Sequence, residues 1–518
     1  MLFNSYIFIF AFLPITWALY FIINRFGRYR LAEAVLVMCS LVFYGYKNWR
    51  FAFLLIGSIL VNYAIYILFN KVGEDKAKKG IRIILLILGL LFNFGILAYY
   101  KYVNFFLENL AAITGSDFVL RDIVLPLGIS FYTFQQVSFV VDSYKGQVKG
   151  YGFWEYALFV SFFPQLIAGP IVLHSEMVPQ FRDEAKKKIN TENVYDGLIY
   201  FITGLAKKVL IADMLGRGVD WGYDNILCLN SLSAVTLVVL YTLQIYFDFS
   251  GYCDMAMGIG RLFNLDIVKN FDSPYKALSV TEFWKRWHIT LTRFFTTYFY
   301  IPLGGNRKGK WRTYLNIFIV FAVSGLWHGA DWTFVLWGVI HGLMMIFERL
   351  LGIGRGDSKK ENASEGSEYI RPVRSLWKWL YTFTFVGLAW VLFRADSFED
   401  AMNVYKRIIH GGSGLVLADM RDAILMDKSS LIFDQLDKMP FAADGIRNVI
   451  FAVVILAVMF ITVFWRNSHE IVSESENKEH TSLGLNLNEL VRAVAFGLLF
   501  VLCVISLTGV SKFLYFNF

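Results

Sequence analysis

Three of the seven histidines lie in or beside long apolar runs: His288, His328 and His341. An ionisable side chain in such a run is costly to bury and marks a functional site by default. An imidazole is largely neutral at neutral pH and can take a proton from a hydroxyl group. Each of the three can equally be a hydrogen-bonded packing residue. The other four are expected at the surface or at a membrane interface: His174, His410, His469 and His480.

The surroundings of His328 favour catalysis most. This histidine lies in the sequence Ser-Gly-Leu-Trp-His-Gly-Ala-Asp at residues 324–331, whose small residues let another helix or a substrate approach closely. Asp331 can orient the imidazole, or it can cap the following helix at the outer interface. The histidines do not have the spacing of zinc ligands, and the sequence contains no His-Glu-x-x-His pattern, so we predict no metal site.

A basic window extends from Lys285 to Arg312 and contains seven Lys or Arg residues but no acid. It also contains His288 and a Pro-Leu-Gly-Gly turn at 302–305. The window can be an ordinary cytoplasmic loop. Alternatively, it can bind the phosphates of a donor such as coenzyme A or a phosphopantetheine carrier. For that docking site we predict six residues: Lys285, Arg286, Arg293, Asn306, Arg307 and Lys308.

The composition indicates a membrane protein. Of 518 residues, 57% are hydrophobic and only 17% are charged, whereas soluble domains carry about 25% charged residues. This excludes a soluble multidomain protein and a disordered chain. No nucleic-acid-binding pattern accompanies the net charge of +8, so we interpret the charge as a signal of topology. Four scattered cysteines are expected mostly as buried thiols without a disulfide framework: Cys39, Cys228, Cys253 and Cys503.

Fourteen apolar runs predict an all-α polytopic bundle of about eleven to thirteen membrane helices. The runs cover residues 6–24, 31–46, 51–70, 81–100, 123–141, 153–173, 194–212, 232–252, 287–303, 313–330, 332–351, 376–393, 449–465 and 489–509. The segments 125–128 and 287–302 are expected to be re-entrant or interfacial. One of the two runs between residues 101 and 180 is not expected to cross the membrane fully.

Basic loops orient the predicted helices. The segments 25–30 and 71–82 are rich in Arg and Lys and are expected in the cytoplasm, which places both termini outside. The polar segment 352–374 is expected to be a flexible cytoplasmic loop, and the acidic segment 395–448 an interfacial region of the outer face. We expect all of this to form one integral-membrane domain over residues 1–518.

Four sequence motifs carry a resemblance to a known family. They are Asn-Phe-Asp-Ser-Pro-Tyr-Lys-Ala (270–277) followed by Glu-Phe-Trp-Lys-Arg-Trp-His (282–288), Tyr-Ile-Pro-Leu-Gly-Gly-Asn-Arg (300–307), Gly-Leu-Trp-His-Gly (325–329) and Phe-Pro-Gln-Leu-Ile-Ala-Gly-Pro (163–170). In these motifs the chain resembles the membrane-bound O-acyltransferases (MBOAT). It is most similar to the bacterial branch that acts in alginate acetylation, peptidoglycan O-acetylation and teichoic-acid D-alanylation.

The resemblance implies a fold and a mechanism. It implies a tunnel in which an acyl thioester enters from the cytosol and the acceptor from outside. His328 matches the family's essential histidine, and His288 matches a second histidine in the cytosolic part of the tunnel. The donor is expected to be acetyl-CoA or an acyl carrier thioester, used as a substrate, with no bound cofactor. Inside a water-poor channel, His328 would activate an acceptor hydroxyl for attack on the thioester.

The C-terminal segment 511–518 is rich in aromatic residues and reads Ser-Lys-Phe-Leu-Tyr-Phe-Asn-Phe. By composition it is an aromatic belt at the outer interface. It also resembles a terminal motif of bacterial family members, in which the tyrosine is thought to carry the acyl group. We therefore predict Tyr515 as an acyl relay, with His328 as base, to an extracellular SGNH-type acyltransferase.

These observations favour a membrane acyltransferase of the bacterial cytoplasmic membrane that supports O-acetylation of an exported polysaccharide. Three alternatives stay open at this point: D-alanyl transfer to teichoic acid, a membrane transporter without chemistry, and a structural scaffold for a cell-wall synthase. The acceptor polymer is not specified by the sequence.

Overall fold

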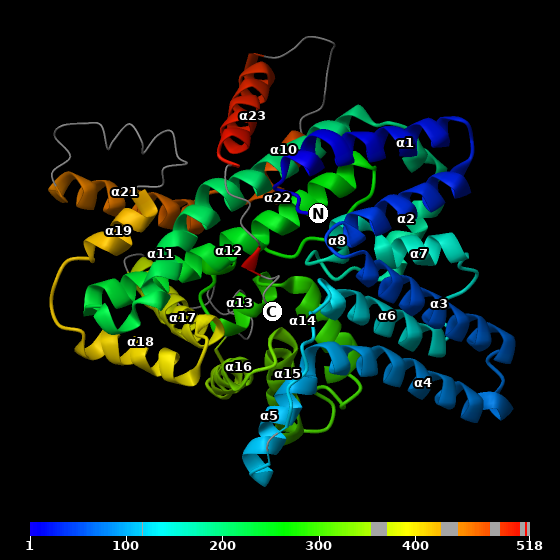
Figure 1. Cartoon of the computed structure of the whole chain (residues 1–518), viewed down its shortest axis with the longest axis horizontal. Coiled ribbons are helices and arrows are strands. Elements are labelled where there is room, and N and C mark those ends of the chain that lie inside the picture. Colours follow the sequence, from blue (N-terminus) through cyan, green and yellow to red (C-terminus); the bar gives the residue numbers. More distant parts are fainter. Residues whose placement is uncertain (117, 354–369, 426–443, 477–486, 508–512, 515–518) are drawn as a thin grey trace. The chain divides into compact units, whose positions relative to one another are not determined.

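The computed structural model describes the chain except residues 117, 354–369, 426–443, 477–486, 508–512 and 515–518. Every regular element in the described part is a helix, as predicted (Figure 1). The described residues divide into two compact units. The first unit holds residues 1–201 and 252–269, and the second holds residues 202–251 and 270–514.

The helices of the first unit are η1 (Phe8–Phe12), α1 (Leu13–Arg25), α2 (Tyr29–Gly45), α3 (Trp49–Val72), η2 (Lys76–Lys78), α4 (Lys79–Leu97), η3 (Ala98–Tyr102), α5 (Val103–Thr114), α6 (Ile129–Tyr144), α7 (Phe153–Ser161), α8 (Phe163–Leu166), α9 (His174–Arg182) and η4 (Glu184–Lys187). Helices α10 (Thr191–Ala206) and α12 (Ser231–Leu262) contribute residues to both units.

The helices of the second unit are η5 (Lys207–Ala212), α11 (Asp213–Asp224), η6 (Ile226–Cys228), η7 (Pro274–Lys276), α13 (Val280–Arg286), α14 (Ile289–Phe295), η8 (Thr296–Tyr300), α15 (Lys310–His328), α16 (Trp332–Leu350), α17 (Ile370–Arg394), α18 (Phe398–His410), α19 (Ala418–Leu425), α21 (Asp444–Phe464), α22 (Ser468–Glu476) and α23 (Leu487–Ile505).

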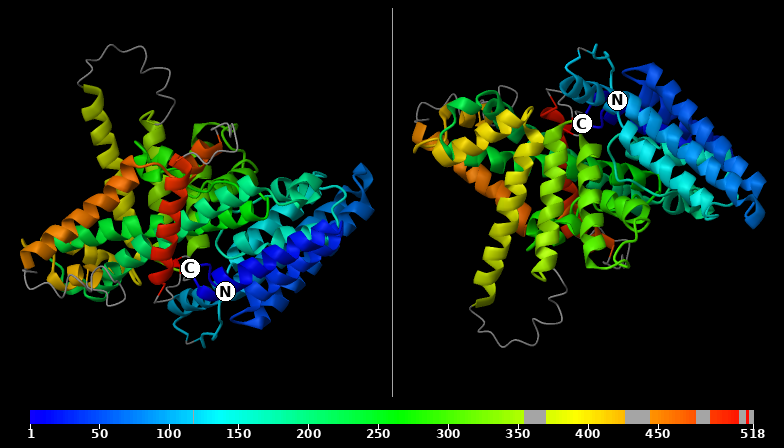
Figure 2. Two further views of the ribbon diagram at one scale, coloured as in Figure 1. Left: turned by 90° about the horizontal axis from the view of Figure 1, so that it is seen from above. Right: turned by 90° about the horizontal axis from the view of Figure 1, so that it is seen from below.

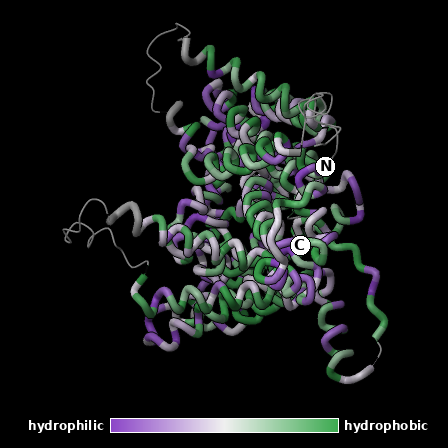
Figure 3. The backbone as a smooth tube through the Cα atoms, turned by 90° about the vertical axis from the view of Figure 1, so that its left-hand side faces the viewer, coloured by the Kyte–Doolittle hydropathy of each residue, from purple (hydrophilic) through white to green (hydrophobic). Residues whose placement is uncertain are grey.

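Among the described residues, seven helical stretches are long and apolar enough to cross a membrane: Phe8–Arg25, Trp49–Val72, Lys79–Thr114, Ser231–Leu262, Trp332–Leu350, Ser375–Arg394 and Gly445–Phe464. The chain is therefore a multi-pass membrane protein. Hydrophobic residues are spread along most of its helices (Figure 3). Seven is fewer than the eleven to thirteen predicted, because several other apolar runs form helices that are shorter or more polar.

Two of the predicted runs are not continuous helices. The run 153–173 breaks after nine residues at Phe162, whose ψ of 110° is not helical, and only the four-residue helix α8 follows. Pro164 prevents a continuous helix because its ring would clash with the preceding turn. The run 123–141 becomes helical only at Ile129, since residues 118–126 form no regular element. Gly128 there has a φ of +75°, which glycine adopts without a steric penalty.

Buried amides connect four helices of the first unit. Asn62 of α3 and Asn93 of α4 each donate a hydrogen bond to the other's side-chain oxygen. Asn62 also donates to Gln136 Oε1 of α6, and Gln136 donates to Ser58 of α3. Tyr156 of α7 donates to the same Gln136 oxygen. Because helices in a membrane lack a strong hydrophobic drive to associate, such bonds help to hold them together.

In the second unit, α15 and α16 form an antiparallel hairpin, and α17 packs against α16 (Figure 2). The two hairpin helices cross where Gly325 faces Gly338. A side chain at Gly325 would meet the backbone of Phe334, and one at Gly338 would meet the backbone of Phe321. The small residues around His328 therefore admit another helix, which is one of the two predicted uses.

Three predicted segments lie partly outside the described residues. Most of the 352–374 loop and most of the tail 511–518 lie there, and with the tail lies Tyr515. Of the 395–448 segment, the described part contains the helices α18 and α19.

Candidate active site

His288 lies between α13 and α14 in an unusual backbone conformation. Its φ is +46°, in the left-handed region that is uncommon for residues other than glycine, and its side chain is fully buried. Such conformations persist only where the surroundings enforce them, and they cluster at functional sites. Here the next residue, Ile289, donates its backbone N–H to the carbonyl of Asn270 over 2.9 Å.

The side chain of Asn270 fixes the imidazole of His288. Asn270 Oδ1 lies 3.2 Å from His288 Nδ1. The same oxygen accepts the backbone N–H of Thr290 at 3.2 Å and the Thr290 hydroxyl at 2.8 Å. Since a backbone N–H only donates, this atom is the amide oxygen, and His288 must donate to it from Nδ1. The proton is thereby assigned to Nδ1, and Nε2 carries the basic lone pair.

Burial also determines the charge of His288. Desolvation lowers the pKa of its imidazole to about 3, so the ring is neutral at physiological pH. A neutral imidazole with its lone pair on Nε2 has the form required of a proton acceptor.

His328 is the last residue of α15 and is 3% exposed. Its ring lies among aromatic side chains, 5.2 Å from Trp337 and 5.3 Å from Phe393 between centroids. The ring of His288 is 6.4 Å from that of His328. The fold therefore brings together two histidines that are 40 positions apart in the sequence.

The third buried histidine, His341, lies on the other side of Trp337, at 5.0 Å between ring centroids. Its Nδ1 lies 3.1 Å from Nε1 of Trp284. Indole nitrogen only donates, so His341 Nδ1 accepts this bond. His341 thus connects α16 to α13 and supports the packing interpretation for this histidine.

Glu348 of α16 holds the start of α13. Its carboxylate is fully buried and accepts the backbone N–H groups of Val280 at 2.7 Å and Thr281 at 2.8 Å, and also the Thr281 hydroxyl at 2.7 Å. A carboxylate at a helix N-terminus satisfies otherwise unpaired donors. This residue positions the helix that leads to His288.

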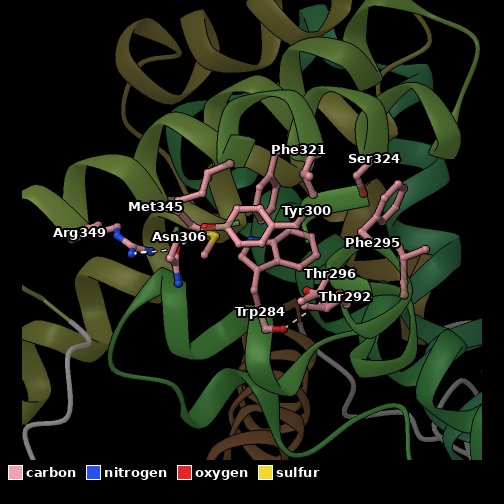
Figure 4. A pocket seen from close by; sticks show the side chains of 13 residues that line it. Trp284, Thr292, Phe295, Thr296, Tyr300, Asn306, Phe321, Ser324, Met345 and Arg349 are labelled. Carbon is pink, nitrogen blue, oxygen red and sulfur yellow. Dashed lines mark hydrogen bonds between the residues drawn. The ribbon is translucent and has the colours of Figure 1, made fainter. Parts of the chain in front are cut away.

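A cavity of about 230 Å³ follows the α15–α16 hairpin (Figure 4). At one end lie Asn306 and Arg349, which are joined by a 3.1 Å hydrogen bond. At the other end lies Ser324, one helical turn before His328 and on the same face of α15. The walls between them are mainly apolar: Trp284, Leu291, Phe295, Ile317, Val320, Phe321 and Met345.

Comparison with known proteins matches residues 81–391 to the membrane-bound O-acyltransferase family. The chain belongs to this family. It is 38% identical to a peptidoglycan O-acetyltransferase of Helicobacter pylori, over 100% of this chain and 98% of that protein. It is 34% identical to a probable alginate O-acetylase AlgI of Pseudomonas putida, over the full length of both.

A more distant relative is a teichoic acid D-alanyltransferase of Streptococcus thermophilus, which is 27% identical over 42% of this chain. Together with the family match, these relatives identify the protein as a membrane acyltransferase. The alternative of a transporter without chemistry does not fit this assignment.

The six residues predicted to bind the donor differ in exposure and in partners in this MBOAT protein. Arg286 pairs with Glu282 at 2.9 Å, and also donates to the carbonyl of Asp272. Lys285 and the loop residues Arg307 and Lys308 are exposed, whereas Arg293 is half-buried. Only Asn306 lines the cavity, and the cation beside it is Arg349, which was not predicted.

The remaining predictions concern Asp331 and four further histidines. Asp331 caps α16 by accepting the backbone N–H of Thr333 at 2.7 Å, which is the capping alternative. His174 is buried within the protein between Asp142 and Tyr151, at 3.2 and 3.0 Å, and its place at a membrane interface stays a prediction. His410 and His469 are exposed as predicted, and His480 lies outside the described residues.

The cysteines and possible metal ligands complete the comparison. Cys253 and Cys503 are buried, but Cys228 is exposed and Cys39 is half-buried. In the part of the chain that the structure describes, no three His, Cys, Asp or Glu side chains are grouped so that they could hold a metal ion.

Proposed function

We propose that this acyltransferase moves an acetyl group from acetyl-CoA on the cytosolic side of the bacterial cytoplasmic membrane toward an exported polysaccharide. The two relatives with full-length similarity are named for O-acetylation of peptidoglycan and of alginate. Since the D-alanyltransferase is similar over less than half of the chain, acetyl is the favoured acyl group.

The cavity carries this proposal, because it leads from a polar end to within one helical turn of His328. The α15 residues that line the cavity extend from Ile317 to Ser324, about 10 Å along the helix axis. Arg349 and Asn306, with the exposed Arg307 and Lys308 nearby in the chain, would receive the donor's phosphates. The apolar walls would take the extended arm that ends in the thioester. Basic loops favour the cytoplasm, so this end of the hairpin would face the donor.

The chemistry requires one base and a dry site. The imidazole of His328 takes the proton of an acceptor hydroxyl, whose oxygen attacks the thioester carbonyl carbon. The carbon–sulfur bond breaks as the ester bond forms, and the imidazolium returns its proton to the leaving sulfur. His288, neutral and oriented by Asn270, packs beside His328 and would help to shape the site around the reacting groups. The surrounding aromatic rings exclude water that would hydrolyse the thioester.

In the complete pathway, the Tyr515 hydroxyl is the first acceptor, and an SGNH-type acyltransferase outside the membrane receives the group from the resulting ester. Tyr515→Phe would then abolish polymer acetylation in cells while leaving slow thioester hydrolysis by the purified enzyme.

The test uses purified protein, radiolabelled acetyl-CoA and the variant His328→Ala. We expect acetyl transfer and thioester hydrolysis to fall by about 10³-fold, which is within the usual range for loss of a general base. The control is His410→Ala at an exposed histidine, which should keep the wild-type rate. A His328→Ala protein that elutes as a monodisperse species and retains activity would refute the assignment. Transfer from a D-alanyl-loaded carrier protein, but not from acetyl-CoA, would favour the alternative reaction.

A further inference from the structure

The described part of the C-terminal tail is docked in the second unit. Phe513 is 1% exposed, and the backbone N–H of Leu514 donates a 2.9 Å hydrogen bond to Asp248 Oδ2. Asp248 lies on the membrane helix α12 and is 2% exposed. A backbone group of the tail therefore binds one oxygen of a carboxylate buried within the protein.

Lys208 completes this arrangement. Its ammonium group lies 2.6 Å from Asp248 Oδ1 and 2.8 Å from Asp213 Oδ1. It also lies 4.6 Å from the centroid of the Phe513 ring, within the range of a cation–π interaction. Lys208 belongs to the π-helical segment η5, and π-helical turns are frequent at functional sites.

The two carboxylate oxygens of Asp248 have different partners, which points to a role in binding the tail. Lys208 satisfies Oδ1, while Oδ2 accepts from Leu514. Without the tail, Asp248 Oδ2, which is a buried and charged acceptor, would lose the hydrogen bond from Leu514. Hydrogen bonds to charged acceptors are among the stronger ones in proteins. A simple structural ion pair would not require the tail at this position.

Asp248 is followed on α12 by a residue that packs against the proposed active site. Phe249 follows Asp248 on α12, and its ring is 4.9 Å from the ring of His288. The tail is thus bound one residue away from a side chain that packs directly on the proposed catalytic group.

We propose that Lys208 and Asp248 form a receptor for the C-terminal tail, with Phe513 as the anchor and the Leu514 backbone as the polar contact. Occupation of this receptor is a precondition for acyl transfer to the tail. The link to transfer rests on the proposed relay function of Tyr515, whereas the docking itself does not.

The test measures tail docking without activity. In a Cys228→Ser background, Leu514→Cys retains the backbone N–H and adds a thiol whose rate of reaction with a maleimide reports undocking. The receptor is removed with the double variant Lys208→Met/Asp248→Leu, which replaces both buried charges and leaves only the partly exposed Asp213 without the Lys208 ammonium. We expect labelling to become at least about tenfold faster, from the loss of a hydrogen bond to a charged group.

Two matched variants separate docking from general loosening. Lys187→Met/Glu33→Leu removes another buried ion pair, of 3.4 Å, and should leave the labelling rate unchanged. Asp248→Asn keeps an acceptor for the Leu514 N–H and should label more slowly than the double variant. Unchanged labelling in the Lys208→Met/Asp248→Leu protein would overturn the receptor, and so would equal acceleration by the Lys187→Met/Glu33→Leu control.

The activity readout separates this inference from the relay. Loss of the receptor should abolish labelled acetyl on Tyr515 while thioester hydrolysis continues, since His288 and His328 are untouched. If labelling accelerates but polymer acetylation in cells persists, docking stands and the relay function fails.

Discussion

The first unit buries a network of amides, and the second unit buries a cluster of imidazoles. In the network, Asn62, Asn93 and Gln136 exchange hydrogen bonds of 2.6 to 3.1 Å across three helices. Amides do not titrate, and here they bind one another, so the network is suited to fixing helix positions. In the cluster, His288 and His328 contact mainly aromatic rings, beside a cavity.

The difference between the amides and the imidazoles shows that buried polar side chains can serve either structural support or chemistry. Both groups are polar and are buried among helices, which is costly unless hydrogen bonds compensate. The amides use their donors and acceptors on each other. By contrast, His288 donates from Nδ1 to Asn270, which places the basic lone pair on Nε2. A group that can still accept a proton is suited to chemistry, whereas one whose hydrogen bonds are mutual is suited to support.

Among variants that distinguish the imidazole cluster from the amide network, Asn270→Ala is expected to have the largest effect. This variant removes the acceptor that fixes the His288 tautomer, and we expect kcat for acetyl transfer to fall by about 10²-fold, with little change in KM for acetyl-CoA. The control is Thr290→Val, which removes one donor from the same amide oxygen but leaves the imidazole contact intact. A raised KM at unchanged kcat would show that Asn270 acts on binding and not on the imidazole.

His288 and His328 could each be predicted as a candidate site residue, but the sequence did not indicate that their side chains lie close together. His288 and His328 stood out as ionisable groups in apolar runs, whereas their 6.4 Å separation depends on how Asn270 ties the loop after α13. That loop is formed by contacts over 18 to 20 positions, which local periodicity does not encode. Glu348 was missed, although an acid within an apolar run is the same kind of signal.

The apolar runs predicted that the elements are helices, but they were a poorer guide to where a helix is interrupted. Pro164 is a signal that the 153–173 run would break, and it was available from the sequence. Arg349 was missed because it lies outside the basic window and reaches Asn306 only through the antiparallel pairing of α15 and α16. The contact of His174 with Asp142 could not be predicted, because Asp142 lies on another helix, 32 positions away.

A smaller effect, on stability instead of activity, is expected from Asn62→Leu. The variant leaves Asn93 Oδ1 without the Asn62 donor, whereas Gln136 Oε1 still accepts from Tyr156. An unsatisfied buried polar group costs about 1–3 kcal/mol. The apparent Tm in detergent should fall by a few degrees, while the activity per folded molecule should remain that of the wild type. In Asn62→Leu/Asn93→Leu both partners become apolar, and part of the loss should be recovered. A large fall in specific activity would show that the amide network is also part of the catalytic machinery.

The smallest effect is expected in the pH dependence of stability. The pKa of His288 is about 3 in the folded protein, lowered by burial, against about 6.5 when the chain is unfolded. Between these values the unfolded state binds the extra proton, so His288 makes stability fall as pH decreases from 6.5, by at most about 1.4 kcal/mol per pH unit. His288→Asn cannot titrate, and Asn tolerates a positive φ better than most residues. The apparent Tm of this variant should therefore fall less steeply than that of the wild type between pH 6.5 and 5. The exposed control His410→Asn and the amide variant Asn62→Leu should both keep the wild-type slope of apparent Tm against pH. If His288→Asn also keeps that slope, His288 is not held neutral by burial.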